Sequence, residues 1–188
     1  MALLGPGNLT VRLALAAFGA LAACAHAEEP VTDEYQVKAA FLYNFAKFVE
    51  WPSGTGGRSS SIAICVLGQN PFGRVLEDTV DGKTVDGKTF VVRHVSEVKA
   101  AAHCQIVFVC SSERKRFGAI LGELRTGGVL TVGESEGFIE EGGVVNLKLD
   151  GGKIQIQINM NAAEQSGVRI SSKLLGLAQI IRKPVQAK

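Results

Sequence analysis

Hydrophobic residues recur at two different spacings along this chain, and the two spacings predict helices alternating with strands. Residues 35–50 repeat apolar positions every three or four residues, which predicts an amphipathic helix that ends at Trp51 and Pro52. The inward positions of this helix would be Val37, Ala40, Phe41, Asn44, Phe45, Phe48 and Val49. Its polar positions would be Lys38, Lys47 and Glu50.

The middle of the chain contains unbroken apolar runs, at 62–67 and 105–110, of the kind found in strands that are buried on both faces of a parallel sheet. Helical spacing and turn residues lie between these runs. The predicted elements are, in order, a strand at 62–67, a helix from Pro71 behind an Asn70 cap, strands at 90–95 and 105–110, a helix at 112–126, and a strand at 129–132.

The pattern changes near residue 145, where apolar and polar residues begin to alternate. Residues 145–149 and 154–159 flank a turn at Asp150, Gly151 and Gly152, which predicts an antiparallel hairpin with one polar face. A last helix is predicted over residues 171–182, with Ile170, Leu174, Leu177, Ala178 and Ile181 facing inward. The expected fold class is therefore α/β: a mostly parallel central sheet flanked by helices, with a C-terminal antiparallel hairpin and a final helix.

The first 27 residues have the composition of a secretory signal peptide. A single cation, Arg12, precedes a short apolar run, and Ala25-His26-Ala27 is a small-x-small cleavage site. We favour cleavage after Ala27, which leaves residues 28–188 as a single domain. A lipobox ending at Cys24 is an alternative, in which Cys24 would be lipidated. Either route exports the chain, and the apolar run is too short to span a membrane.

Composition and charge narrow the function classes. The chain has 188 residues, of which 46% are hydrophobic and 20% are charged, as expected for a globular domain rather than a disordered chain. Nineteen cationic and eighteen acidic residues follow residue 27, a net charge of about +1, and no basic block stands out. We therefore expect no nucleic-acid partner.

Three cysteines follow the signal segment, and an exported chain can keep disulfides. Cys65, Cys104 and Cys110 allow one disulfide and leave one thiol. Cys65 and Cys110 lie in apolar runs typical of burial, whereas Cys104 lies at a predicted strand entrance where a bridge can form. Neither a C-x-x-C motif nor a His/Cys cluster is present, so we expect no metal site and no cofactor.

One short motif resembles a catalytic signature. Residues 133–137 match G-x-S-x-G around Ser135, but a nucleophile elbow needs a helix after the turn, and here glycines and a strand follow. All three histidines, the last of them His103, precede Ser135. We interpret the motif as a glycine-rich turn and expect no catalytic residue, with a Ser135 hydrolase kept as an alternative.

The segment 35–52, YQVKAAFLYNFAKFVEWP, resembles the N-terminal signature of the YfiR-like family of bacterial periplasmic proteins. Shorter pieces agree in the family's order, at residues 65–68 with 71–73, 104–108, 142–147 and 170–175. The resemblance covers about residues 33–183, nearly the whole chain after the signal segment.

The resemblance implies a function that the composition alone does not. Members repress an inner-membrane diguanylate cyclase, the enzyme that makes cyclic di-GMP, through its periplasmic domain. An OmpA-like outer-membrane lipoprotein sequesters the repressor, and the family implies an α/β homodimer with structural disulfides. The pair Cys65 and Cys104 matches one family disulfide, whereas a second has no counterpart because no cysteine follows Cys110. Cys110 is then a free, buried thiol.

For the cyclase-binding surface we expect the segment from Glu164 to Ile170, beside a polar strand face at Gln155 and Gln157. An exposed Ile170 would anchor such an interface. The alternative is that Ile170 packs as a helix-start residue. A periplasmic small-molecule sensor without a cyclase partner is the second function that the sequence allows.

Overall fold

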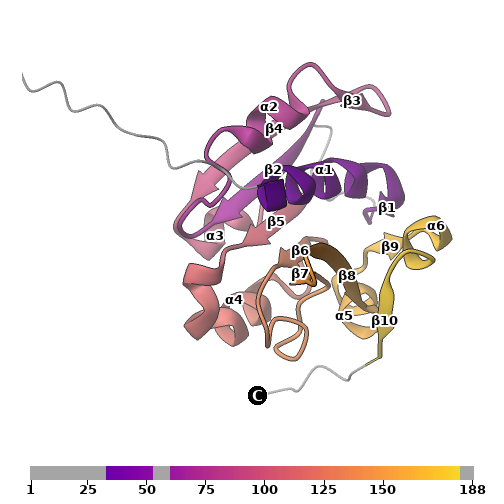
Figure 1. Cartoon of the computed structure of the whole chain (residues 1–188). Helices are drawn as coiled ribbons and strands as arrows, with labels where there is room; N and C mark the ends of the chain where they lie inside the picture. The colour runs from indigo at the N-terminus through magenta and orange to yellow at the C-terminus, as the bar shows by residue number, and fades with distance from the viewer. Residues whose placement is uncertain (1–32, 53–59, 183–188) are drawn as a thin grey trace, which may run out of the picture.

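A mixed eight-stranded sheet forms the centre of the computed structural model, which describes residues 33–52 and 60–182 (Figure 1). From edge to edge the strands are β10 (Gln179–Ile181), β8 (Lys153–Asn159), β7 (Val145–Asp150), β6 (Leu130–Gly133), β5 (Ile106–Val109), β2 (Ser61–Leu67), β4 (Lys88–Val95) and β3 (Thr84–Val85). The five strands from β7 to β4 are parallel. β8 and β3 are antiparallel to their neighbours β7 and β4.

Helices pack on both faces of this sheet. They are α1 (Asp33–Phe48), α2 (Val75–Val80), α3 (Val98–Ala101), the 3-10 helix η1 (Ser111–Arg116), α4 (Phe117–Leu124), α5 (Met160–Ser166) and α6 (Ser172–Leu175). Alternate residues of β2 enter two separate cores: Ile64 joins the core under α1, and Cys65 joins the core under α4. Because both faces are covered, β2 is apolar along nearly its whole length, as its sequence predicts.

The α/β fold with its mostly parallel sheet and C-terminal hairpin is as predicted from the sequence. β7 and β8 pair in register from Val145 with Ile158 to Asp150 with Lys153, around the predicted glycine turn. A separate two-stranded sheet, β1 (Val49–Glu50) with β9 (Arg169–Ile170), joins the end of α1 to the C-terminal region.

The prediction of a long final helix over residues 171–182 was wrong. α6 spans one turn and gives way at Gly176, and the chain then forms β10, which pairs with the edge of β8. Leu174 is buried as predicted, but Leu177 is 74% exposed rather than inward. Strand pairing with β8 decides this outcome, because the free edge of β8 offers backbone partners that a local pattern does not reveal.

Two other helix predictions need correction. The helix expected from Pro71 begins later, at Val75, because the Asn70 side chain holds a turn by accepting from the N–H of Phe72 and donating to the carbonyl of Gly73. The helix expected over 112–126 starts as η1 and becomes α-helical only from Phe117.

The inward face of α1 was predicted only in part: Phe45 is buried as expected, and so is Val49 just after the helix, but the other buried positions differ from the predicted ones. The buried residues of this helix are Lys38, Ala39, Leu42, Phe45 and Ala46, whereas Val37 is 44% exposed. Ala39, Leu42 and Ala46 form a helical stripe as regular as the predicted one, since the helix carries apolar residues on more than half of its surface. The consequence for Lys38 is described with the candidate site.

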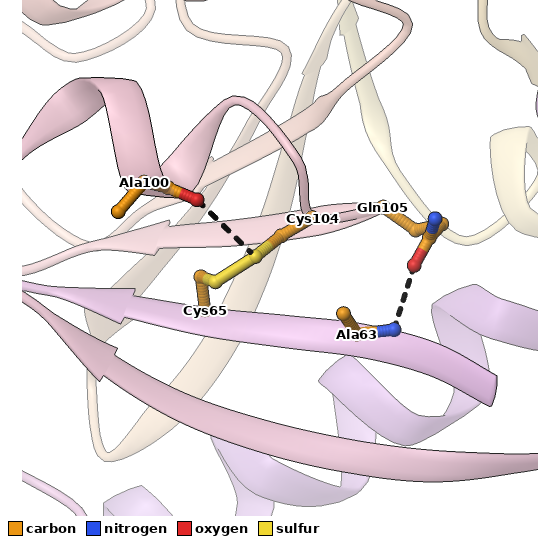
Figure 2. The surroundings of a disulfide bond; sticks show 5 residues. All are labelled: Ala63, Cys65, Ala100, Cys104 and Gln105. Carbon is orange, nitrogen blue, oxygen red and sulfur yellow. Dashed lines mark hydrogen bonds between the residues drawn. A yellow bond between two sulfur atoms is a disulfide. The ribbon is translucent and has the colours of Figure 1, made fainter. Parts of the chain in front are cut away.

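Two links fix β2 against β5. The disulfide that the family resemblance implies is present: Cys65 in β2 is joined to Cys104, which lies two residues before the start of β5 (Figure 2). One residue further, the side-chain carbonyl of Gln105 accepts a 2.6 Å hydrogen bond from the N–H of Ala63. Cys110, at the other end of β5, is buried and free.

Trp51 closes the amino-terminal edge of the sheet. Its indole N–H donates a 3.0 Å hydrogen bond to the backbone carbonyl of Gln105, which also accepts from the backbone N–H of Leu130.

We expect Trp51→Phe to lower the free energy of unfolding by about 1 kcal/mol, because one hydrogen bond is lost while most of the apolar contact is kept. Urea unfolding of the variant beside the parent protein measures this. An unchanged unfolding midpoint would contradict the stated role of the indole N–H.

Candidate functional site

The carboxyl edge of the sheet is the first candidate site. The chain passes from β2 to β4 on one side and then crosses to β5 on the other, so the ends of β2 and β5 form a topological switch point. Open α/β sheets commonly bind ligands at such a point. Here the carboxyl ends of β5 and β6 lead into Cys110 and Glu134, respectively.

A buried ion-pair cluster occupies this edge. The ammonium of Lys38, from α1, is 2.6 Å from a carboxylate oxygen of Glu134 and also contacts Glu34, and it lies 4.7 Å from the ring centre of Tyr35. The side chains of Lys38 and Glu134 are 2% and 5% exposed. The other Glu134 oxygen accepts from the N–H of Ser111 at 3.3 Å. Each buried charge is therefore compensated, and the cluster ties α1 to the end of β6.

Two neighbouring groups are held in their neutral forms. Burial, followed by the negative charge of Glu134, raises the pKa of the Cys110 thiol to about 12. Burial and the same carboxylate, which also bonds the phenol, raise the pKa of Tyr35 above its usual value. At neutral pH the cluster therefore offers neither a thiolate nor a phenolate as a nucleophile.

The loop after β2 packs against the start of η1 at the same carboxyl edge of the sheet. Gly68 has a φ of +104°, and a Cβ there would lie 2.5 Å from the Ser112 hydroxyl, which itself accepts from the N–H of Gln69. The Ser112 side chain therefore packs closely against the backbone of this loop at the carboxyl end of β2.

Ser135 lies in a turn just after β6, as interpreted from its glycine-rich surroundings. Turns, not a helix, follow it, and the preceding carboxylate, Glu134, is engaged with Lys38. His94, the histidine on β4, bonds instead to Glu77 of α2 at 2.7 Å. Within residues 33–52 and 60–182, no hydrogen bond joins Ser135 to a histidine, and no group of three or more His, Cys, Asp or Glu could hold a metal ion.

The second candidate site is the segment that joins α5 to β9. Asn159 caps α5 by accepting from the N–H of Ala162, and Gly167 ends it with a φ of +76°. A Cβ at Gly167 would also approach the Pro52 ring at 3.3 Å. This turn holds Glu164 on the exposed side of α5, where its side chain makes no ion pair within the described part of the chain.

Ile170 and Gln157 are less exposed than the predicted cyclase-binding surface requires. Ile170 pairs with Val49 across β1 and β9 and is half-buried against the core under α1. Gln157 is only partly exposed, since its side chain bonds to Asn146 and to Gln179 of β10, whereas Gln155 is exposed and bonds to Asp150. We call the exposed surface formed by Glu164, Gly167, Arg169 and the outer part of Ile170 the α5–β9 surface.

Comparison with protein families identifies the chain. The family model described as YfiR/HmsC-like matches residues 35–179. The chain therefore belongs to the YfiR/HmsC-like family, whose members are periplasmic regulators of cyclic di-GMP signalling rather than catalysts. No curated protein matches the sequence.

Solved structures show likeness of fold only. A crystal structure of a conserved domain protein from Vibrio cholerae O1 biovar El Tor covers 78% of this chain and 59% of its own, at 12% identity and a TM-score of 0.55. The ABC domain in complex with L-Trp from Streptococcus pneumonia covers 64% of this chain and 55% of its own, at 14% identity and a TM-score of 0.46. This chain thus spans less than two thirds of either structure's length.

One structural observation agrees with the periplasmic location of the family. The disulfide between Cys65 and Cys104 fits an oxidising compartment. Across the described ranges, none of the helices has the length and apolarity needed to cross a membrane. The predicted signal segment, with Arg12 and Cys24, lies outside the described residues.

Sequence reasoning missed the role of Lys38. The pattern assigned it to the polar face of α1, yet it is 2% exposed, and its main partner, Glu134, lies 96 residues away. One signal was present: Glu34 lies four residues before Lys38, the spacing of a helical ion pair. That spacing alone also fits a solvent-exposed pair, so burial was not predictable from it.

Proposed function

We propose that this protein represses an inner-membrane diguanylate cyclase by binding its periplasmic domain through the α5–β9 surface. The observation that carries the proposal is the family match over residues 35–179, since this family regulates cyclic di-GMP signalling. Binding would stabilise an inactive arrangement of the cyclase, and removal of the protein would shift that population toward the active one.

The α5–β9 surface has features suited to a regulated contact. Glu164 is an exposed carboxylate on a helix whose two ends are capped, so its position is defined before binding. Ile170 adds an apolar side chain whose inner part is held by the core and whose outer part remains accessible. A charged rim beside an apolar anchor is a common arrangement in protein interfaces.

The remaining parts of the proposal follow the family. Residues 1–27 would serve as the signal peptide and residues 28–188 as one periplasmic domain, with lipidation at Cys24 as the alternative export route. An OmpA-like outer-membrane lipoprotein would sequester the repressor, and the repressor would act as a homodimer. No cofactor and no catalytic residue is assigned.

Reversing the charge of Glu164 tests the binding surface. We expect Glu164→Lys to weaken binding to the cyclase's periplasmic domain about tenfold. In the proposed interface the Glu164 carboxylate faces a cationic group of the cyclase, and a lysine at this position would repel that group. Titration calorimetry with the purified periplasmic domain measures the affinity. The matched control is Glu123→Lys, an exposed glutamate on α4 at the opposite face of the sheet.

Equal affinities for Glu164→Lys and the parent protein would remove the α5–β9 surface from the proposal. Loss of binding in the Glu123→Lys control would transfer the contact to the α4 face. A metabolite that raises the melting temperature of the protein, with no cyclase binding by the parent chain, would support the sensor function instead.

A further inference from the structure

Two lysines from different elements converge on one aromatic ring. The ammonium groups of Lys47, in α1, and of Lys83 lie 4.2 Å and 4.7 Å from the ring centre of Tyr43. Lys83 lies in the turn between α2 and β3, which Figure 1 shows above α1. The two ammonium groups are therefore within about 9 Å of one another, about one Debye length at physiological ionic strength, so each charge acts on the other.

Local structure positions the ring and the turn. The ring of Tyr43 packs against Phe90 of β4, with the two ring centres 5.5 Å apart. The backbone N–H of Lys83 donates a 3.1 Å hydrogen bond to the carbonyl of Val80, and Gly82 has a φ of +65°, which allows the chain to turn there. The aromatic ring and the backbone that carries Lys83 are thus in place before any ligand arrives, which lowers the cost of binding one.

Neither lysine has a carboxylate partner in the described part of the chain. Among the described residues, no ion pair involves Lys47 or Lys83. The acids nearest to them in sequence, Glu50, Asp81 and Asp86, are all exposed. An aromatic ring attracts each cation through its quadrupole, but it carries no net charge. Two like charges therefore share this ring without an anion between them.

We propose that Lys47 and Lys83, placed by the Tyr43 ring, form a binding site for a phosphate group. Lysine ammonium groups are common phosphate ligands, because each is a compact charge with three donors on a flexible stem. A phosphate presents oxygens in several directions, so two lysines that arrive from different elements can each bind a different oxygen. The bound anion is attracted to both cations and offsets their mutual repulsion.

The phosphate group belongs either to a soluble molecule or to a lipid headgroup, since the same two ammonium groups recognise both. The site shares no residue with the α5–β9 surface, and it does not rest on cyclase binding. The inference therefore goes beyond the proposed function. Failure of the phosphate site and failure of cyclase binding are observed in separate experiments.

Titration of the nitrogen-15-labelled protein with inorganic phosphate, followed by nuclear magnetic resonance, tests the site. Sodium chloride at equal ionic strength is the reference. We expect saturable shifts of the backbone amides near Lys47 and Lys83, with a dissociation constant of about 1–10 mM, because two exposed contacts give weak binding. Lys83→Met should raise this constant at least about fivefold. The matched control is Lys153→Met, an exposed lysine at the start of β8, which should bind like the parent protein.

Vesicles separate the two sources of the phosphate. Co-sedimentation compares phosphatidylcholine vesicles that contain about 30% phosphatidylglycerol with vesicles of phosphatidylcholine alone. Association with the anionic vesicles that Lys83→Met lowers and Lys153→Met keeps would assign the phosphate to a lipid headgroup. Saturable binding of inorganic phosphate without vesicle association would assign it to a soluble molecule. Amide shifts no larger than those in chloride, or equal phosphate affinities of Lys83→Met and the parent protein, would each overturn the proposal.

Discussion

Replacing Lys38 with methionine is expected to lower the free energy of unfolding by about 3–5 kcal/mol, because it leaves the Glu134 carboxylate buried without its cation. Methionine keeps the apolar stem of the side chain, so the loss reports the charge. The Glu134 side chain is 5% exposed and lies 2.6 Å from the ammonium, so bulk water has little access to the carboxylate. Since domains are stable by about 5–15 kcal/mol, this single change removes a large share of the total.

Two further variants separate the ion pair from general damage to α1. Lys38→Met combined with Glu134→Gln removes both charges and should recover most of the loss. Lys47→Met is the matched control on the same helix: Lys47 is exposed, 4.2 Å from the Tyr43 ring centre, and its removal should cost about 1 kcal/mol or less. Urea unfolding measures all three. If the single and double variants were equally unstable, the buried pair would not be the cause.

Removing the disulfide is the change with the next largest expected effect. Cys65 and Cys104 are 39 residues apart, and a loop of that length corresponds to about 4 kcal/mol in the chain-entropy account of disulfides. The double substitution of both residues by alanine should therefore lower the melting temperature by about 10 °C. Differential scanning calorimetry of the variant and the parent protein measures the shift.

Cys110→Ala is the control for this prediction, because Cys110 is also buried but forms no disulfide. It should lose about 1 kcal/mol at most, and a reductant should still lower its melting temperature as it does for the parent protein. The double alanine variant should be insensitive to reductant. An unchanged melting temperature of the parent protein in reductant would contradict a stabilising role for the disulfide.

The buried strands were predictable from the sequence because short unbroken apolar runs favour strands that are covered on both faces. β2 and β5 are unbroken apolar runs that are too short for a typical buried helix, and a strand covered on both faces accommodates them. The hairpin of β7 and β8 was equally clear, since alternation on both sides of Gly151 and Gly152 fixes both the faces and the turn.

Elements that depend on distant contacts were not predictable. The segment from Gln179 to Ile181 has residues suited to either a helix or a strand, and its pairing with β8 decides between them. The inward face of α1 was ambiguous because apolar residues surround much of the helix. The burial of Lys38 depends on Glu134, which directly follows the carboxyl end of β6.

The candidate site residues also include some that the sequence predicted and some that depend on distant contacts. Three cysteines after the signal segment allow several pairings, and it was the family resemblance that singled out Cys65 with Cys104. Glu164 is exposed on α5, but Ile170 combines a paired backbone with a half-buried side chain, an arrangement that depends on β1 and so on residues far earlier in the chain.

The most direct test of the regulatory function is the level of cyclic di-GMP in the native host with and without this gene. Deletion should raise the level, because the cyclase loses its repressor, and the exported protein should restore it. A version without residues 1–27, and the Glu164→Lys variant at equal abundance, should fail to restore it. An unchanged level of cyclic di-GMP on deletion, in cells that contain the cyclase, would contradict repression by this protein.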